Sequence, residues 1–368
     1  MTSPDLPAWF TRAIAAPYTE HVASEGACPI HYLRWGSGGD TCAPAKPPVI
    51  LIHGGGAHAH WWGFLAPLLT DRYDVLALDL SGHGDSGRRD RYPREVWAGD
   101  VLAVIDHAKL SQRPVIVGHS MGGFVSMVTA ALHGERLAGA ILVDSPVRPP
   151  RPTDVEPTPA EPSESGDKQR AGWSFQRMAP YPDFESAVSR FRLLPEQPAP
   201  YAFLLDYVAS TSVRKDDDGY TWKFDPRVFE KASRSSLRDY FVSARCRLAV
   251  VRGSESTVLP KDIAEYMVGL LPGRVPLVEV PEAHHHLMFD QPLPFLVAIR
   301  TLLADWQCSL PILKASVGEA PTASSILTAL VGEAPTASSI LTASVGEAPT
   351  ASSILTASVG EAPTSFLP

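Results

Sequence analysis

The stretch VIVGHSMGGF, at residues 115–124, decides the fold of this chain. Its first three residues form a β-branched apolar run, which is typical of a buried parallel strand. The pentapeptide GHSMG at residues 118–122 follows, and helix-forming residues continue after it. In this context Gly-x-Ser-x-Gly forms a sharp strand-to-helix turn, and glycines flank the serine because a Cβ there would clash. The sequence therefore predicts Ser120 to be a nucleophile that stands clear at the carboxyl edge of a sheet.

Short apolar strands alternate with helices on both sides of this stretch. Strands are expected at residues 30–35, 49–52, 75–80, 115–117, 140–143, 248–251 and 276–280. Helices are expected at residues 61–69, 94–108, 123–132, 261–271 and 294–306. Such alternation predicts an α/β fold with a mostly parallel central sheet and helices on both of its faces.

Two segments interrupt or follow this alternation. Residues 148–167 are dense in proline and glutamate and are expected to form a mobile surface loop, and an aromatic, helix-leaning region follows up to residue 240. From about residue 315 the unit VGEAPTASSILTA recurs with a period of 14, and each copy carries a glycine and a proline. The predicted domains are a core in two parts (residues 1–147 and 241–310), an inserted cap (148–240) and a disordered tail (311–368).

The bulk composition argues against several classes of function. The 368 residues are 45% hydrophobic and 20% charged, with a net charge of -8, so no basic surface for nucleic acid is expected. No apolar run is long enough for a membrane span, and no signal peptide is recognisable at the start. Four scattered cysteines without CxxC spacing are typical of free thiols. We therefore expect a cytoplasmic protein.

Four motifs together resemble one superfamily. They are LIHGGG at residues 51–56, DLSGHGDS at 79–86, GHSMGG at 118–123 and AHHH at 283–286. The region from residue 31 to 304, about three quarters of the chain, resembles a lidded α/β-hydrolase of the esterase or lipase type. The resemblance implies the α/β-hydrolase fold with an inserted helical cap, and a serine hydrolase activity whose substrate it does not name.

The same resemblance implies positions for the oxyanion hole and the base. The two oxyanion donors correspond to the backbone N–H groups of Gly55 and Met121. The base lies among His284, His285 and His286. Family members place a proline seven residues after the catalytic histidine, and counting back from Pro292 selects His285, while its two neighbours stay open.

The acid of the triad has two candidates. Many relatives carry Gly-x-x-Asp after the penultimate strand, but here Ser256 occupies the position of that aspartate, and Glu255 lies one residue earlier. Asp144, directly after the strand expected at 140–143, is the other candidate and is preferred because Glu255 needs a shifted turn. Asp79 and Asp85 are expected to shape a turn instead.

No metal and no organic cofactor are expected. The segment HAHWW at residues 58–62 contains only half of the HxHxDH motif of metallo-hydrolases. Three consecutive histidines point in different directions and do not readily close on one ion. We therefore expect His58 and His60 to line a pocket mouth or to be solvated.

The predicted function is hydrolysis of a carboxylic ester, or a related acyl bond, through an acyl-Ser120 intermediate. A small apolar substrate is favoured by Trp61, Trp62 and the aromatic residues of the insert, although most of the latter are expected to form its core. The alternatives are hydrolysis of a C–C bond in a β-diketone on the same site, or a ligand-binding signalling protein with little turnover. The ester itself and the oligomeric state stay open.

Overall fold

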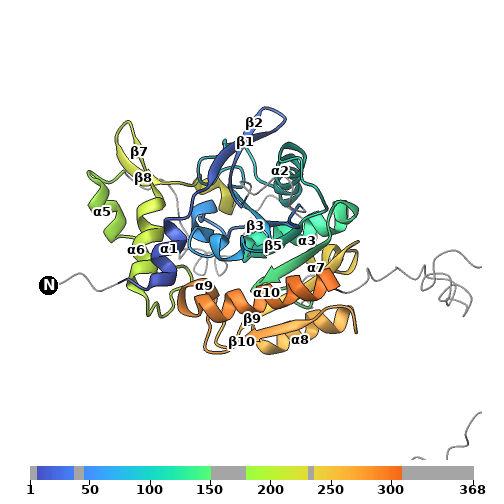
Figure 1. Cartoon of the computed structure of the whole chain (residues 1–368). Helices are drawn as coiled ribbons and strands as arrows, with labels where there is room; N and C mark the ends of the chain where they lie inside the picture. Colours follow the sequence, from blue (N-terminus) through green and yellow to red (C-terminus); the bar gives the residue numbers. More distant parts are fainter. Residues whose placement is uncertain (1–5, 37–44, 151–179, 231–235, 309–368) are drawn as a thin grey trace, which may run out of the picture. The chain divides into compact units, whose positions relative to one another are not determined.

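The computed structural model describes residues 6–36, 45–150, 180–230 and 236–308, and is built around an eight-stranded sheet (Figure 1). The strand order is β1-β2-β4-β3-β5-β6-β9-β10; β2 is antiparallel to both of its neighbours, and all other pairs are parallel. The strands are β1 (Thr19–Glu25), β2 (Cys28–Trp35), β3 (Pro48–Ile52), β4 (Asp74–Leu78), β5 (Val115–His119), β6 (Gly139–Val143), β9 (Arg247–Gly253) and β10 (Leu277–Val280). The predicted mostly parallel sheet is confirmed.

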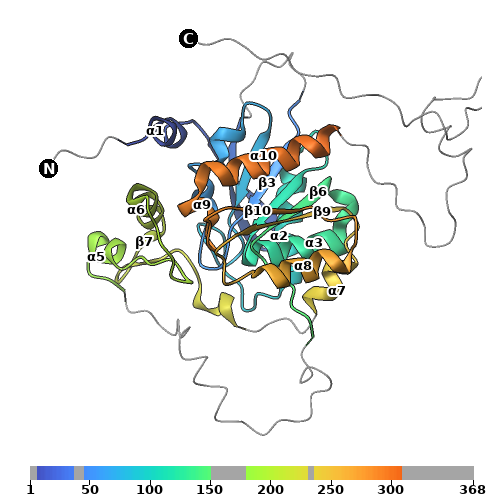
Figure 2. The ribbon, with the colours of Figure 1, turned by 90° about the horizontal axis from the view of Figure 1, so that it is seen from below.

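Helices cover both faces of this sheet, as the alternation of elements predicts (Figure 2). One face carries α2 (Arg94–His107), α3 (Met121–His133), α7 (Leu237–Val242) and α8 (Lys261–Leu270). The other face carries α1 (Ala8–Ile14), α9 (Leu287–Asp290), α10 (Pro292–Cys308) and the 3-10 turns η1 (Ala59–Trp62) and η2 (Ala66–Leu69).

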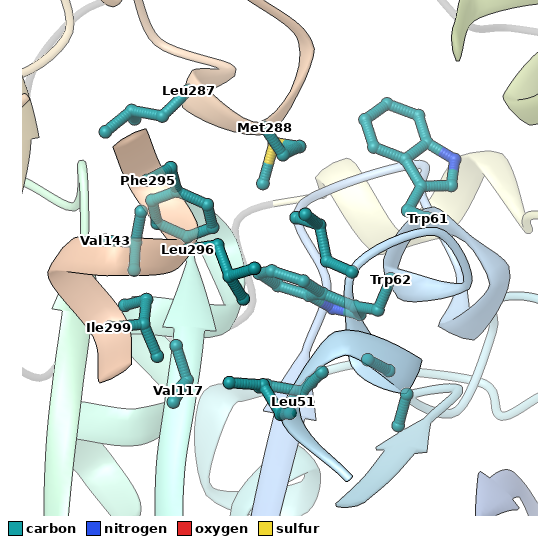
Figure 3. Packing of buried hydrophobic residues seen from close by; sticks show 14 of the residues in the cluster. Leu51, Trp61, Trp62, Val117, Val143, Leu287, Met288, Phe295, Leu296 and Ile299 are labelled. Carbon is teal, nitrogen blue, oxygen red and sulfur yellow. The ribbon is translucent and has the colours of Figure 1, made fainter. Parts of the chain in front are cut away.

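The central strands are apolar throughout because both of their faces are buried. In β5, Val117 packs into the core beneath α10, and Ile116 packs into the core beneath α3. Alternate residues of a strand point to opposite faces, so one short run of valine and isoleucine serves two cores. Figure 3 shows the first of these cores, where Leu51, Val117 and Val143 meet Phe295 and Ile299.

The strand order reverses between β3 and β5, next to the predicted nucleophile. The chain passes from β3 to β4 on one side and then crosses back to β5 on the other. Open α/β sheets bind ligands at the carboxyl ends of the strands where such a reversal occurs. The end of β3, with its glycine-rich turn, and the end of β5, with Ser120, therefore lie side by side.

Two expectations differ from the structure. The edge strand β1 was not predicted because its sequence, TEHVASE, is mostly exposed and lacks an apolar run. The helix expected at residues 61–69 is two 3-10 turns, since Gly63 and Pro67 break it. A helix, α7, begins at Leu237 within the range predicted for the cap, and it packs its buried Phe241 against the core.

The described part of the insert between β6 and β9 contains a hairpin as well as helices. It consists of α5 (Phe184–Ser189), α6 (Ala202–Thr211), the hairpin β7–β8 (Val213–Asp216 and Gly219–Trp222) and η6 (Pro226–Phe229). Most of the proline-rich loop, the aromatic residues Trp173 and Phe175, and the 14-residue repeats lie outside the described residues. Within the described ranges no helix has the length and apolar character needed to cross a membrane.

Hydrogen bonds fasten this insert to the core at Ser212. Its hydroxyl donates to the Val208 carbonyl (2.7 Å) and accepts from His58 Nε2 (2.9 Å) and Trp61 Nε1 (3.4 Å). His58 is buried, so the expectation that it is solvated or lines a pocket mouth is wrong. Burial also lowers its pKa well below the ordinary histidine value. His58 is therefore a neutral anchor for the insert.

Replacing this anchor should destabilise the protein. We expect Ser212→Ala to lower the free energy of unfolding by about 1–3 kcal/mol, because it leaves the buried N–H of His58 without its acceptor. Ser210→Ala, an exposed serine on the same helix that bonds only to the Tyr207 carbonyl, should change it by less than about 0.5 kcal/mol. Urea unfolding measures both, and equal effects would contradict the assignment of Ser212 as an anchor.

Candidate active site

Ser120 occupies a strained turn between β5 and α3. Its backbone has φ 53° and ψ -115°, a conformation that side chains rarely adopt. A Cβ on Gly118 would lie 2.2 Å from the Gly122 carbonyl oxygen, and one on Gly122 would lie 2.5 Å from the His53 carbonyl oxygen. Both positions therefore require glycine. The Ser120 N–H donates to the Val143 carbonyl (2.9 Å), which ties the turn to β6.

Three side chains from distant parts of the chain meet at this turn. His285, in the loop after β10, lies with Nε2 3.0 Å from Ser120 Oγ and with Nδ1 2.7 Å from Asp144 Oδ2. Asp144 directly follows β6, with φ 49°, and both Asp144 and His285 are buried. A carboxylate accepts hydrogen bonds, so Nδ1 of His285 carries the proton and Nε2 is free to accept the one from the Ser120 hydroxyl.

Glu255, the other candidate acid, is not brought to His285. Its side chain is exposed and accepts a hydrogen bond from the Ser254 hydroxyl (3.0 Å). Ser256 reaches the site instead, and its hydroxyl donates to Asp144 Oδ2 at 2.5 Å. The Gly253 N–H donates to the other oxygen of Asp144 at 3.3 Å.

The sequence did not predict that Ser256 contacts Asp144, although this position had been compared with the Gly-x-x-Asp pattern of the resemblance. The direction of its hydrogen bond follows from its other contacts. The N–H groups of Val258 (3.2 Å) and Leu259 (3.3 Å) donate to its oxygen, so its proton is left for Asp144. Buried Arg252 holds this loop through the carbonyls of Leu259 and Ser254 and an ion pair with Glu279.

The three adjacent histidines have three different sets of partners. His284 is half-buried and bonds to Asp290 (2.9 Å), whereas His285 joins Ser120 and Asp144. His286 is buried and donates from Nε2 to the Leu194 carbonyl of the insert (3.1 Å). Of the three, only His285 therefore lies within hydrogen-bond distance of the predicted nucleophile.

A fourth histidine, His119, supports the loop that carries His285. Its Nε2 donates to the His285 carbonyl oxygen (2.9 Å). Burial, reinforced by the neighbouring His285, lowers the pKa of His119 to about 3, and the same causes lower that of His286 well below its ordinary value. Both rings are therefore neutral around pH 7.

The predicted oxyanion turn lies against the start of α3. His53 orders this turn: its Nε2 accepts from the Leu80 N–H (3.0 Å) and its Nδ1 donates to the Gly54 carbonyl (2.7 Å). A Cβ built on Gly55 would lie 3.7 Å from Met121 Sδ, so the two predicted donor residues are neighbours. Met121 is the first residue of α3, where an N–H has no carbonyl partner within the helix.

Asp79 organises the turn after β4, as expected of a turn-forming residue. Its carboxylate accepts from the backbone N–H groups of Ala59 (2.6 Å) and Asp85 (2.9 Å) and from His31 Nδ1 (2.8 Å). Burial opposes ionisation, but the hydrogen bond from His31 and the charge of that ring outweigh it, so the pKa of Asp79 lies below its usual value. The Asp85 side chain pairs with Lys223 of the insert (2.7 Å).

Comparisons with known proteins agree with this architecture. A family model described as the alpha/beta hydrolase fold matches residues 47–292. A pimeloyl-acyl-carrier-protein methyl ester esterase of Edwardsiella ictaluri (strain 93-146) is 32% identical over 105 residues, which are 28% of this chain and 39% of that protein. A 2-hydroxy-6-oxo-6-(2'-aminophenyl)hexa-2,4-dienoic acid hydrolase of Metapseudomonas resinovorans is 32% identical over 132 residues, which are 35% and 43%.

A solved structure extends the likeness over most of the chain. The crystal structure of E-2-(acetamidomethylene)succinate hydrolase superposes with a TM-score of 0.64 at 20% identity, over 78% of this chain and 100% of that one. At this identity the likeness is one of fold. The chain spans 30% to 43% of the length of the first curated relatives that it matches.

The need for glycine at the turn can be tested with a matched pair of substitutions. Gly122→Ala should lower the free energy of unfolding by about 1–3 kcal/mol or more, because its Cβ would meet two backbone carbonyls of the β3 end. Gly269→Ala, in α8 with nothing within 4 Å of the new Cβ, should raise it by up to about 1 kcal/mol. Urea unfolding of both decides, and a neutral Gly122→Ala would refute the close approach.

Proposed function

Because this chain belongs to the α/β-hydrolase family, we propose that it hydrolyses a carboxylic ester through an acyl-Ser120 intermediate. One observation carries the proposal: His285 lies between Ser120 Oγ (3.0 Å) and Asp144 Oδ2 (2.7 Å), the arrangement that activates a serine hydroxyl. The curated relative that cleaves a methyl ester supports the choice of bond.

In the first step, Ser120 Oγ attacks the ester carbonyl carbon while His285 Nε2 takes the hydroxyl proton. Asp144 accepts the Nδ1–H of His285 throughout, which holds the ring in the reactive tautomer and stabilises the imidazolium. When the tetrahedral intermediate collapses, the C–O bond to the alcohol breaks, and His285 returns the proton to the departing alkoxide oxygen. The acyl group is then bonded to Ser120.

The second step repeats this chemistry with water. His285 Nε2 takes a proton from the water, whose oxygen attacks the acyl carbon, and then protonates Ser120 Oγ as the carboxylic acid leaves. In both steps the negative oxygen is assigned to the backbone N–H groups of Gly55 and Met121. Such donors lower the barrier because they are already oriented before charge develops.

Ser256 is proposed to position the acid in this mechanism. Its hydroxyl and the Gly253 N–H hold the two oxygens of Asp144, so that the carboxylate presents one lone pair to His285. A rigid acid is useful because the histidine ring must keep its orientation while its proton moves. Asp144 is accordingly proposed as the third member of the triad, and Glu255 is not.

The proposed substrate has an apolar group next to its carbonyl. Two aromatic side chains of the insert lie over the oxyanion turn. The ring of Phe229 is 3.0 Å from the position of a Cβ on Gly55, and Phe224 is 3.7 Å from that of a Cβ on Gly56. With the half-buried Met121 on the other side, these groups favour an acyl or alcohol part without charge.

Hydrolysis of a C–C bond is the second candidate, since one relative is named for a hydrolase of a dienoic acid. That reaction needs a proton delivered to a carbon leaving group. Ester hydrolysis needs the proton only at an oxygen. His285 Nε2, which would deliver that proton, already lies near Ser120 Oγ. The ester is therefore preferred, and a panel of p-nitrophenyl esters and β-diketones distinguishes the two reactions.

The nucleophile can be tested with a fluorophosphonate probe. Wild-type protein should be labelled and should turn over p-nitrophenyl esters, whereas Ser120→Ala should do neither. Ser210→Ala, which alters an exposed serine, should label like wild type. Failure of the wild type to label, or equal labelling of Ser120→Ala, would reject the proposal and favour a binding protein without turnover.

The acid can be tested by comparing two substitutions that each remove one carboxylate. Asp144→Asn should lower kcat by about ten-thousand-fold, because the amide favours the wrong tautomer of His285. Glu255→Gln should change kcat by no more than about twofold, since Glu255 is exposed and lies away from the histidine. Two mild effects would refute the triad, and a larger loss for Glu255→Gln would reverse the assignment.

A further inference from the structure

Three buried imidazoles gather beside Ser120. One ring nitrogen from each of His119, His285 and His286 lies within 4.8 Å of one from each of the other two. Their ring centroids are 4.7 to 5.2 Å apart. Of the three, only His285 exchanges a proton in the proposed hydrolysis, whereas His119 and His286 each use one ring nitrogen to hold a backbone carbonyl.

The hydrogen bonds of these rings determine which nitrogens keep a lone pair. His119 donates from Nε2 to the His285 carbonyl, and His286 donates from Nε2 to the Leu194 carbonyl. Each neutral ring carries one proton, so Nδ1 of both rings holds an unshared lone pair. Both of these nitrogens are buried, and neither has a hydrogen-bond partner within the described residues.

His285 has the same arrangement with its two nitrogens exchanged. Its Nδ1 donates to Asp144, and its Nε2 lone pair faces the Ser120 hydroxyl. In each of the three imidazoles, therefore, one ring nitrogen donates its proton to a carbonyl or carboxylate oxygen. The other ring nitrogen carries a lone pair that points away from that proton. Histidines that bind metals in proteins are oriented in this way, with the second ring nitrogen donating to an oxygen.

We propose that His119, His285 and His286 form a site for one transition-metal ion, with Zn²⁺ as the representative, and that the bound ion inhibits the enzyme. Three protein nitrogens with a fourth position open is a common zinc arrangement, and Ser120 Oγ or water would complete it. Tetrahedral coordination at 2.0–2.1 Å puts the nitrogens roughly 3.3 Å apart, so a pair of nitrogens at the 4.8 Å limit would need to close by about 1.5 Å. This inhibition, but not the binding, rests on the proposed function.

Inhibition follows from the lone pair that the metal takes. A metal bound at Nε2 of His285 leaves that nitrogen unable to accept the proton of Ser120. The ion would also occupy the space where an ester carbonyl approaches the serine. Since no covalent bond is made, a chelator should restore the full rate.

A second cluster of metal-ligating side chains within the described residues differs in chemistry. His31, Asp79 and Asp85 also lie within 4.8 Å of one another. There, however, Asp79 accepts from His31 and from two backbone N–H groups, while Asp85 pairs with Lys223. Its lone pairs are already used to hold the turn, so the proposal concerns the histidine cluster alone.

The test is direct titration of chelator-treated, tag-free protein with Zn²⁺ by calorimetry, and with Co²⁺ by its visible d–d absorption. We expect one ion per chain. His286→Gln and His119→Gln should each weaken binding at least about tenfold, because glutamine retains the N–H donor but lacks the imidazole lone pair. The matched control is His284→Gln, which alters the adjacent half-buried histidine outside the cluster and should bind as wild type does.

Hydrolysis supplies the second measurement. In wild type and His284→Gln, Zn²⁺ should inhibit with a midpoint equal to the measured dissociation constant. In His286→Gln, the Zn²⁺ concentration that halves this variant's own metal-free rate should be at least about tenfold higher. Urea unfolding checks that each variant is folded, and if one of the two cluster variants does not fold, the other decides.

The outcomes separate this proposal from the proposed function. A protein whose Ser120 labels but which binds no Zn²⁺, or whose cluster variants bind like wild type, overturns the metal site and leaves the hydrolase intact. Zinc binding with the expected variant pattern in a protein that hydrolyses no ester upholds the site and overturns the hydrolase.

Discussion

The structure depends on a close approach of two backbones that leaves no room for a Cβ. Gly122, in the first turn of α3, rests on the carbonyl of His53 at the end of β3, and Gly118 rests on the carbonyl of Gly122 itself. This contact fixes where α3 begins, and it holds Ser120 in a conformation that an unsupported chain would avoid. It also places the turn after β3 beside the start of α3, so that Gly55 and Met121 are neighbours. The strain at the serine is therefore supported by the sheet rather than by the loop itself.

Features that lie within one continuous segment could be predicted from the sequence. The central strands are recognisable because both faces are buried and every residue of the run is apolar, as in β5 and β6. Strand, Gly-x-Ser-x-Gly and helix are adjacent in the chain, so the position of Ser120 required no tertiary information. The edge strand β1 and the hairpin of the insert could not be predicted in the same way, because none of these strands contains a continuous apolar run.

The acid could not be selected from the sequence because the choice depends on contacts between distant segments. Asp144 reaches His285 from a left-handed backbone position at the end of β6, and no local motif predicts that conformation. Its partner Ser256 comes from a loop more than one hundred residues later in the chain. Likewise, the lone pairs of His119 and His286 are defined only by carbonyls that lie far away in the sequence.

The insert and the reactive turn are joined by the same residues. His58 follows the oxyanion turn and holds Ser212 of the insert, while His286 follows the proposed base and holds Leu194. Phe229 of the insert covers the backbone of the oxyanion turn itself. A movement of the insert would therefore act on residues within one to three positions of Gly55 and His285, the residues assigned to the proposed reaction. Because a misplacement of about 1 Å is enough to slow a positioned reaction about a hundredfold, the proposed reaction requires the insert to stay seated as well as the histidine to stay aligned.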